Sequence, residues 1–465
     1  MDVAAQLTDL LGASRVHTHP VDRLIYAKDS GVSSGDPAIV VLPETTEEVA
    51  AIVRIATGAG MPVVARGAGT GLAGGAVPAP GSVLVVLTRM DEIFEVDEVG
   101  QTAWVGPGVI NLDLSDALAD RGLHFAPDPS SQQSSTIGGN VGTNAGGPHC
   151  LAEGSTIAHI LGVEMVTVDG DTVVLGGAAP DLPGYDLRGL VVGSEGTLGL
   201  VTRVLVRLTE NPPDVVTMLI SFADIGDAAR AVSDIISSGL VPAALEMMDG
   251  PMIEAVENFI HADLPVGAGA VLLTEVVGHP AGITAEAALI TEIATTNGAT
   301  GIRTATDEDE RALLWKGRKS AFGAVAQAAP DYYLNDTVVP RTRFVDVLDE
   351  IYAIAGRFDL LLLNVFHAGD GNFHPLISFD ASEPGMSERV VAASHEMVHA
   401  AIAAGGTLSG EHGIGIEKRD LMSEVFSVDD LDAQARLREA FDAEGLLNPG
   451  KILPEGSRCF DRPTT

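Results

Sequence analysis

Basic residues are scarce in this 465-residue chain, which has 27 lysines and arginines against 64 aspartates and glutamates. The formal net charge of -37 disfavours binding to nucleic acids and anionic lipid surfaces, because polyanions are recognised mainly through clustered Lys and Arg. We therefore expect no nucleic-acid partner. An anionic small-molecule substrate would need local positive charge inside its site, supplied by arginine or a metal ion.

Cysteine is also rare, with only Cys150 and Cys459 in the chain. Two cysteines cannot form a disulfide framework at this size, which favours a reducing compartment, and they are too few to ligate an iron–sulfur cluster through four thiolates. No basic segment followed by an apolar run opens the sequence, and the apolar run at 360–366 is too short to span a bilayer. We expect a cytosolic protein without a signal peptide or membrane span.

The length and the 46% hydrophobic content favour two or three globular domains with a mixed α+β pattern. The turn-forming run Asn211-Pro212-Pro213 is the best candidate boundary, and a new domain is expected to start there. We expect a helical extension at 1–36, a domain at 37–212 and a domain at 213–455. Periodicity predicts strands at 39–42, 62–65, 83–87, 164–168, 172–175, 200–208, 217–222, 270–277, 360–366 and 374–379, and helices at 45–57, 225–237, 281–297, 344–358 and 386–405.

Residues 69–74 have the G-x-G-x-x-G spacing of a Rossmann dinucleotide site. We reject that interpretation, because a Rossmann loop must open a helix, whereas Pro78, Pro80 and another strand follow here. The loop at 66–71 still offers closely spaced backbone N–H groups suited to phosphate. Taken alone, these residues fit an ordinary surface turn equally well.

Two further glycine-rich segments bear on this loop. Residues 127–131 lead into the segment 137–147, and residues 193–199 read Gly-Ser-Glu-Gly-Thr-Leu-Gly. In this order, the loops resemble the FAD-binding domain of the vanillyl-alcohol-oxidase and p-cresol-methylhydroxylase-like flavoproteins. The C-terminal half resembles the FAD-linked oxidase domain, ferredoxin-like in fold, of the D-lactate dehydrogenase, glycolate oxidase large subunit and D-2-hydroxyglutarate dehydrogenase branch. The resemblance extends over about residues 37–454.

The resemblance implies an FAD-binding domain at 37–212 and a substrate and metal domain at 213–455. The loop at 66–71 would hold the pyrophosphate, 127–131 and 138–147 would line the isoalloxazine, and 193–201 would meet the adenosine side. Because the glycine loop has no histidine to tether FAD, we expect FAD to be bound non-covalently. The implied cofactor-binding residues are Arg66, Gly67, Ala68, Gly69, Thr70, Gly71, Pro127, Asp128, Ser131, Gly138, Gly139, Gly142, Asn144, Ala145, Glu195, Gly196, Val201 and Asn448.

His367 and His374 flank a Gly-Asp-Gly turn between strand-like runs, and in a hairpin such residues face each other and can converge on one ion. Glu411 and His412, in a loop after a helix, offer a carboxylate and a third imidazole. Two histidines and one carboxylate leave the open positions of a catalytic metal, although spacing alone would favour ordinary hairpin residues. The resemblance implies that His367, His374 and Glu411 bind Zn or Mn.

The resemblance also implies a reaction, the oxidation of a small 2-hydroxy acid to the 2-oxo acid. The metal would bind the substrate's carboxylate and 2-hydroxyl and lower the pKa of that hydroxyl. His412 is the expected base while hydride leaves C2 for flavin N5, since imidazole titrates near neutral pH. Arg318 matches the family's substrate-carboxylate arginine, and a solvated helix face is its alternative.

Leu334 bears on the choice of substrate. It lies where diacid-oxidising relatives carry a lysine, so the sequence favours D-lactate or glycolate, with D-2-hydroxyglutarate as the alternative. The enantiomer stays open. So do the electron acceptor (quinone, cytochrome, electron-transfer flavoprotein or iron–sulfur subunit) and the oligomeric state, a homodimer included.

Two interpretations from other classes remain. His395, Glu396 and His399 fit the H-E-x-x-H signature of zinc metalloproteases, but this short motif leaves the flavin loops unexplained, and a polar helix face also accounts for it. The second is a non-catalytic flavin-binding subunit of a larger electron-transfer complex. The complete set of ligand and base residues argues against it.

Overall fold

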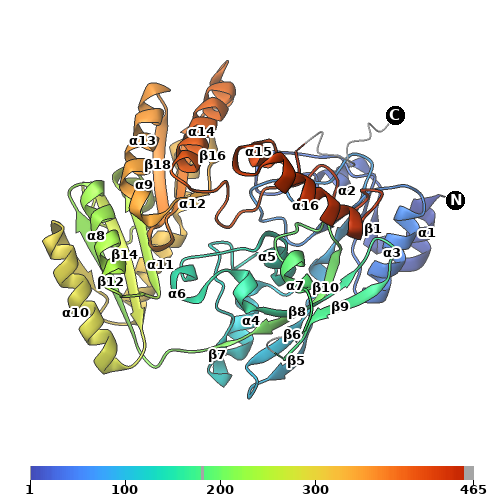
Figure 1. Ribbon diagram of the computed structural model, residues 1–465, viewed down its shortest axis with the longest axis horizontal. Coiled ribbons are helices and arrows are strands. Elements are labelled where there is room, and N and C mark those ends of the chain that lie inside the picture. Colours follow the sequence, from blue (N-terminus) through green and yellow to red (C-terminus); the bar gives the residue numbers. More distant parts are fainter. Residues whose placement is uncertain (1, 180–182, 455–465) are drawn as a thin grey trace. The chain divides into compact units, whose positions relative to one another are not determined.

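The structure is a computed structural model that describes residues 2–179 and 183–454, and these form two compact units (Figure 1). The first unit contains the described residues up to Gly147, the segment Gly154–Asn211 and the residues from Glu411 onward. The second contains Pro148–Glu153 and Pro212–Gly410. Each unit mixes helices and strands, which confirms the predicted α+β class.

The first unit begins with a four-stranded sheet of order β1-β2-β4-β3, parallel except for β1. The hydroxyl of Thr45 caps α3 by accepting from the amide of Glu48, and α3 packs with α1 against this sheet. Because β1 pairs with β2, residues before 37 are part of the unit. These elements are α1 (Val3–Leu11), β1 (Val16–His17), α2 (Pro20–Leu24), β2 (Ile39–Val41), α3 (Thr46–Thr57), β3 (Val63–Arg66) and β4 (Val83–Val86).

A five-stranded antiparallel sheet of order β5-β6-β10-β8-β9 is the second sheet of this unit, and α4 and α5 share its core. Gly170, with a φ of 76°, lies in the tight turn of the β8–β9 hairpin. The elements are β5 (Ile93–Asp97), β6 (Thr102–Val105), β8 (Ile160–Val166), β9 (Thr172–Gly176) and β10 (Leu200–Arg207), the short pair β7 (Leu123–His124) and β11 (Thr209–Glu210), and helices α4 (Asn111–Leu118), α5 (Ile137–Thr143), α7 (Leu187–Val191), α15 (Met422–Val425) and α16 (Val428–Phe441).

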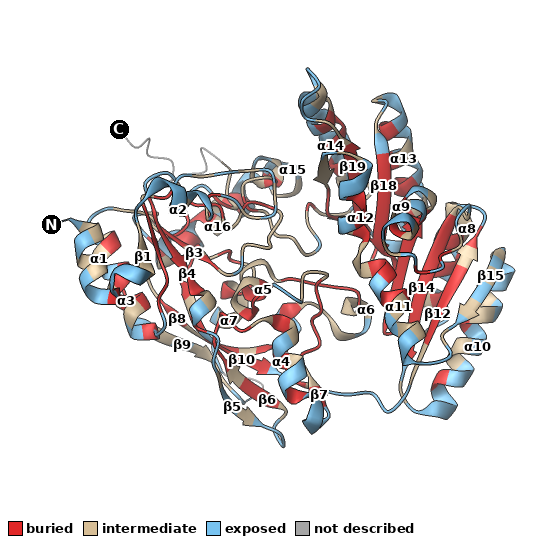
Figure 2. Ribbon diagram, turned by 180° about the vertical axis from the view of Figure 1, so that it is seen from behind, coloured by how far each residue is buried: buried red, intermediate tan, exposed pale blue. Residues whose placement is uncertain are grey.

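The second unit is built on one eight-stranded antiparallel sheet of order β15-β12-β14-β13-β18-β19-β16, with β17 also paired to β19. Helices cover both faces, so adjacent residues such as Met247 and Met248 enter opposite cores and the strands are mostly buried (Figure 2). The strands are β12 (Val215–Phe222), β13 (Ala244–Asp249), β14 (Ala270–Val277), β15 (Ala299–Thr304), β16 (Asp331–Leu334), β17 (Thr337–Val338), β18 (Leu361–His367) and β19 (Asn372–Phe379).

The helices on one face of this sheet are α8, α10, α13 and α14, and those on the other are α9, α11 and α12. They are α8 (Ile225–Ser237), α9 (Gly250–Ile260), α10 (Pro280–Thr296), α11 (Glu308–Lys319), α12 (Ala321–Ala328), α13 (Phe344–Arg357) and α14 (Met386–Ala403), and the short α6 (Cys150–Glu153) also belongs to this unit. None of the described helices combines the length and the apolarity needed to cross a membrane.

The two units differ from a linear division of the chain in two places. The chain passes from one unit to the other between Asn211 and Pro212, but Pro148–Glu153 belongs to the second unit, and the residues from Glu411 onward return to the first. Backbone hydrogen bonds hold this return, since Val63 donates to Leu446 and Asn448 donates to Val63. The parts 1–36, 37–212 and 213–455 therefore stay a proposal about sequence domains; residue 455 and Cys459 lie outside the described residues.

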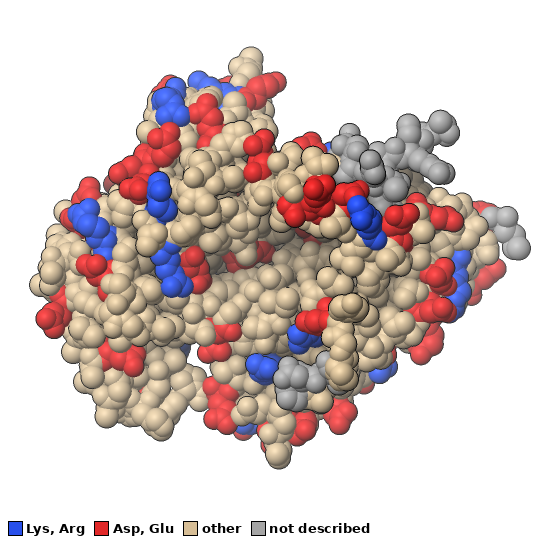
Figure 3. Space-filling view, in the orientation of Figure 1, with Lys and Arg blue, Asp and Glu red and all other residues tan. Residues whose placement is uncertain are grey.

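The loop at 69–74 connects β3 directly to its parallel neighbour β4 with no intervening helix. The rejection of a Rossmann site is thereby confirmed. On the face shown in Figure 3, acidic side chains are spread over the surface, and the basic ones are scattered among them. That distribution agrees with a chain of net charge -37.

Candidate active site

The flavin-binding segments predicted from the sequence lie together in the first unit. Gly193 donates a backbone hydrogen bond to Val141, and Glu195 donates one to Gly142, each at 2.8 Å. The loop at 193–199 is therefore tied to the C-terminal half of α5.

The loop after β3 lies against the beginning of the same helix. A Cβ on Gly67 would stand 2.3 Å from Thr136 Oγ1, and Gly69 has a φ of 77°, so both positions favour glycine. Arg66 is 8% exposed, and its Nη1 has no hydrogen-bond partner among the described residues. Burial lowers the pKa of this guanidinium. A buried cation with an unsatisfied N–H beside a glycine loop fits a pyrophosphate group.

The remaining predicted segments adjoin these loops. A Cβ on Gly147 would lie 2.6 Å from the backbone of Asp128, so the loop at 127–131 runs beside the end of the glycine segment. Asn448 is fully buried, and its Nδ2 donates to the carbonyl oxygens of Gly75 at 2.8 Å and Glu195 at 2.6 Å. The C-terminal segment is thus tied to the glycine loop and to the loop at 193–199, as a common flavin site requires.

The two motif histidines lie together in the second unit. His367 ends β18 and His374 lies in β19, and their ring centroids are 5.0 Å apart. The strand register pairs His367 with Asn372 and His374 with Val365, so the histidines are diagonal neighbours on one face, not directly opposite as expected. Both side chains are buried, and ligand nitrogens of the two rings lie within 4.8 Å of each other, close enough to bind one ion.

Glu246, on β13, is a site residue that the sequence motifs missed. Its carboxylate oxygens both lie 2.9 Å from His367 Nδ1, because β13 and β18 pair these two residues across the sheet. An Nδ1–H donated to this carboxylate makes Nε2 the ring atom that would coordinate a metal. Arg318 Nη2 lies 2.6 Å from the same carboxylate, and both side chains are 1% exposed. The solvated helix face considered for Arg318 is therefore excluded.

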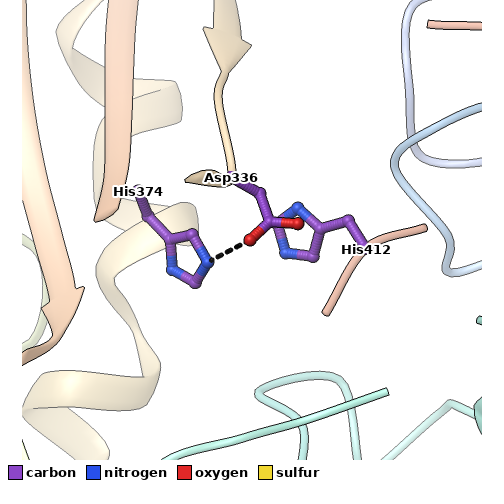
Figure 4. A group of neighbouring side chains, drawn as sticks. All are labelled: Asp336, His374 and His412. Atoms are coloured by element: carbon purple, nitrogen blue, oxygen red, sulfur yellow. Dashed lines mark ion pairs between the residues drawn. The ribbon is translucent and has the colours of Figure 1, made fainter. Parts of the chain in front are cut away.

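Asp336 connects His374 to the loop that precedes Glu411. Its Oδ1 lies 3.6 Å from His374 Nε2 (Figure 4). The same carboxylate accepts from Ser409 Oγ at 2.6 Å and from the amide of Gly410 at 2.9 Å. Asp336 is a site residue that the sequence analysis did not identify, and it holds the last residues of the second unit beside the candidate ligand His374.

Glu411 and His412 are the first residues of the chain's return to the first unit. Glu411 Oε1 lies 3.8 Å from His412 Nε2, and the His412 side chain is 14% exposed. Their assignment as ligand and base stays a prediction.

The H-E-x-x-H motif lies on α14 with His395, Glu396 and His399 all exposed. Glu396 pairs with Arg357 at 2.6 Å. Among the described residues, the groups with ligand atoms close enough for one metal ion include neither of these two histidines. This supports a polar helix face.

A second buried carboxylate, Glu275 on β14, holds the segment Pro148–Glu153 in the second unit. It accepts from Trp315 Nε1 at 2.7 Å and from Arg311 through Nε and Nη2 at 2.9 Å each. His149 Nε2 lies 3.5 Å away, with its ring 5.3 Å from the Trp315 ring. Burial opposes ionisation, but the hydrogen bonds from His149 and Arg311 outweigh it and hold the pKa of Glu275 well below its usual range.

We expect Glu275→Gln to lower the free energy of unfolding by about 1–3 kcal/mol at pH 7, because a hydrogen-bonded charge is lost. A carboxyl group whose pKa is lower in the folded than in the unfolded state stabilises the fold fully at pH values above its unfolded-state pKa. That stabilisation is lost as the pH falls through the folded-state pKa. The difference in free energy of unfolding between wild type and variant, measured by urea unfolding, should therefore decrease below about pH 4. Glu308→Gln, at an exposed partner of Arg311, should change little at any pH. A difference in free energy of unfolding that does not change with pH would contradict the assignment of Glu275 as ionised.

Comparison with known proteins identifies the family. Residues 37–176 match the FAD binding domain, and residues 211–452 match the C-terminal domain of FAD linked oxidases. The glycolate oxidase subunit GlcD of Escherichia coli is 45% identical over 462 residues, covering 98% of this chain and 93% of the relative. The probable mitochondrial D-lactate dehydrogenase of Danio rerio is 32% identical over 428 residues, covering 90% of this chain and 84% of the relative.

Among solved structures, p-cresol methylhydroxylase with substrate bound matches with a TM-score of 0.83 at 16% identity, covering 97% of this chain and 96% of that chain. Fold and loops together define a flavoprotein oxidoreductase with a p-cresol-methylhydroxylase-type fold. The chain belongs to the FAD-linked oxidase family, and it carries that family's FAD-binding domain. The predicted resemblance, fold class and FAD-dependent enzyme class are confirmed.

Proposed function

We propose that this enzyme oxidises a small 2-hydroxy acid, glycolate or D-lactate, to the 2-oxo acid. The observation that carries the proposal is the buried cluster of His367, His374 and Arg318 in the second unit. Arg318 Nε has no hydrogen-bond partner among the described residues, so the guanidinium keeps an N–H donor for an anionic substrate in addition to its ion pair with Glu246. The names of the two relatives, a glycolate oxidase subunit and a D-lactate dehydrogenase, support the same substrate class.

We assign His367, His374 and Glu411 as ligands of a divalent ion, Zn or Mn. Metal-binding histidines usually donate their second ring N–H to a carboxylate or a carbonyl oxygen, and Glu246 is such an acceptor for His367 Nδ1. The amide of Gly410 is hydrogen-bonded to Asp336, which lies beside His374. Glu411 is the next residue, and its Cα is about 3.8 Å from the Cα of Gly410. When bound, such an ion lowers the pKa of a coordinated hydroxyl and holds a carboxylate.

The protein side chains supply the proton transfer and the binding of the substrate. His412 is our proposed base, which accepts the proton of the 2-hydroxyl on an imidazole nitrogen. Arg318 is the proposed partner of the substrate carboxylate, and it would share its guanidinium between that group and Glu246. Non-covalently bound FAD supplies the two-electron acceptor for the C2 hydride.

Leu334 supports a monoacid substrate. It lies on β16 opposite Leu376 of β19 and packs against an apolar core, so it offers no charge to a second carboxylate. D-2-hydroxyglutarate is the alternative that this position disfavours.

Anaerobic flavin reduction tests the proposal. Glycolate, D-lactate, L-lactate and D-2-hydroxyglutarate are added separately to the FAD-loaded protein, before and after treatment with a chelator. We expect glycolate or D-lactate to bleach the flavin, a chelator to prevent it, and added Zn²⁺ or Mn²⁺ to restore it. A flavin that no acid reduces would show that the substrate class is wrong, and reduction unaffected by chelation would exclude the metal.

A further inference from the structure

The side chain of Glu195 holds the loop that carries Glu411 and His412, and all these residues belong to the first unit. Its Oε1 accepts from the amides of Ile414 at 2.7 Å and Gly415 at 3.0 Å, and its Oε2 accepts from Gly415 at 2.9 Å. Glu195 is 7% exposed. The segment two residues beyond His412 is therefore bound to a buried carboxylate.

Three glycines make room for this contact. A Cβ on Gly413 would lie 2.7 Å from Glu195 Oε1, and one on Gly75 would lie 2.7 Å from Oε2. Gly415 has a φ of 53°, and a Cβ there would stand 1.9 Å from the carbonyl oxygen of Ala73. The loop and the carboxylate fit only because these positions carry no side chain.

The backbone of Glu195 is itself held in place. Its φ of 50° is uncommon for a residue other than glycine, and such a conformation persists where the surroundings fix it. Its amide donates to Gly142, and its carbonyl oxygen accepts from Asn448 Nδ2. Glu195 thus bridges two elements through different atoms: its main chain binds the predicted flavin loops, and its side chain binds the loop after His412.

We propose that Glu195 is a positioning residue that fixes Glu411 and His412 through the amides of Ile414 and Gly415. This role adds to the cofactor contact implied for Glu195 by resemblance, and it rests on the proposed function. The Glu195 side chain accepts from two successive amides and is itself held in place by its main-chain hydrogen bonds, so it restricts the loop more than mobile solvent would.

Hydrogen exchange of the FAD-loaded enzyme provides a direct readout. In Glu195→Ala, we expect the amides of Ile414 and Gly415 to exchange about tenfold faster or more, with a smaller change in Glu195→Gln, which keeps one acceptor oxygen. Glu98→Ala, at an exposed surface glutamate, is the matched control and should leave this loop unchanged. If Glu195→Ala does not fold, the glutamine variant decides.

Two further measurements follow. The FAD-loaded enzyme is treated with chelator and titrated with Zn²⁺ alone, and flavin reduction is then measured with the acid that reduces the wild-type flavin fastest. We expect Zn²⁺ affinity and the reduction rate to fall about 10–100-fold in Glu195→Ala. FAD content should be retained, because the contacts of Glu195 with Gly142 and Asn448 are made by its main chain. The proposal would be overturned if the amides of residues 414–415 exchange no faster in Glu195→Ala than in wild type. It would also be overturned if they exchange faster while Zn²⁺ affinity and the rate of flavin reduction stay at wild-type values. If the wild-type protein neither binds Zn²⁺ nor is reduced while Glu195→Ala still loosens the loop, the proposed function fails and the positioning contact stands.

Discussion

Replacing His412 by alanine should slow flavin reduction by the substrate about 10²–10⁴-fold, with FAD still bound. The 2-hydroxyl must lose its proton as hydride leaves C2, and without an imidazole only water is left to accept that proton. The side chain of His412 is 14% exposed, so a truncated site has access to solvent but no positioned base. Stopped-flow measurement of flavin bleaching under anaerobic conditions isolates this half-reaction from the electron acceptor.

His399→Ala is the matched control, because His399 lies on the exposed side of α14. It should reduce flavin at the wild-type rate. Added imidazole should partly restore His412→Ala, and the variant should retain its metal, whereas His374→Ala should lose metal and rate together. A His412 variant within a few-fold of wild type would remove this residue from the mechanism, and one that loses the metal would make it a ligand.

Strongly periodic segments were predictable from the sequence. The bounds predicted for α8 and β14 are those observed, because α8 repeats buried residues such as Ala228, Val232 and Ile235 at helical spacing after the cap Asp224. In contrast, β13 (Ala244–Asp249) was missed, since it contains no β-branched residue. Its place between β14 and β18 comes from pairing with strands distant in sequence.

In the candidate active site too, residues close together in sequence were predictable, and contacts between residues distant in sequence were not. His367 and His374 were found because one turn separates them, whereas their partner Glu246 is 121 residues away from His367 and is brought in by sheet pairing. One local signal was available: Glu246 is an acidic residue between the apolar Leu245 and Met247 of β13. The contact of Glu195 with Ile414 spans 219 residues and has no such signal, because neither loop shows alone that the C-terminal segment returns to the first unit.

Glu246→Ala should lower the free energy of unfolding of the second unit by about 3–5 kcal/mol, because it leaves the charge of Arg318 buried without a counter-charge. Glu246 and Arg318 are each 1% exposed, and Arg318 Nε already has no hydrogen-bond partner among the described residues. His367 would also lose the acceptor at its Nδ1. Urea unfolding in a Trp104→Phe background reports on this unit through Trp315, which lies on α11 with Arg318 and is then the only tryptophan.

The double variant Glu246→Ala/Arg318→Met separates the charge from the lost packing. With the guanidinium gone, no charge is left uncompensated, so the double variant should be more stable than Glu246→Ala alone. Glu308→Ala, at an exposed position on the same helix, should be close to wild type. A double variant no more stable than the single one would exclude the buried charge as the cause. If the double variant is also at least as stable as wild type, the Glu246–Arg318 ion pair contributes no net stability, and we infer that binding of an anionic substrate is the reason for a buried arginine at this position.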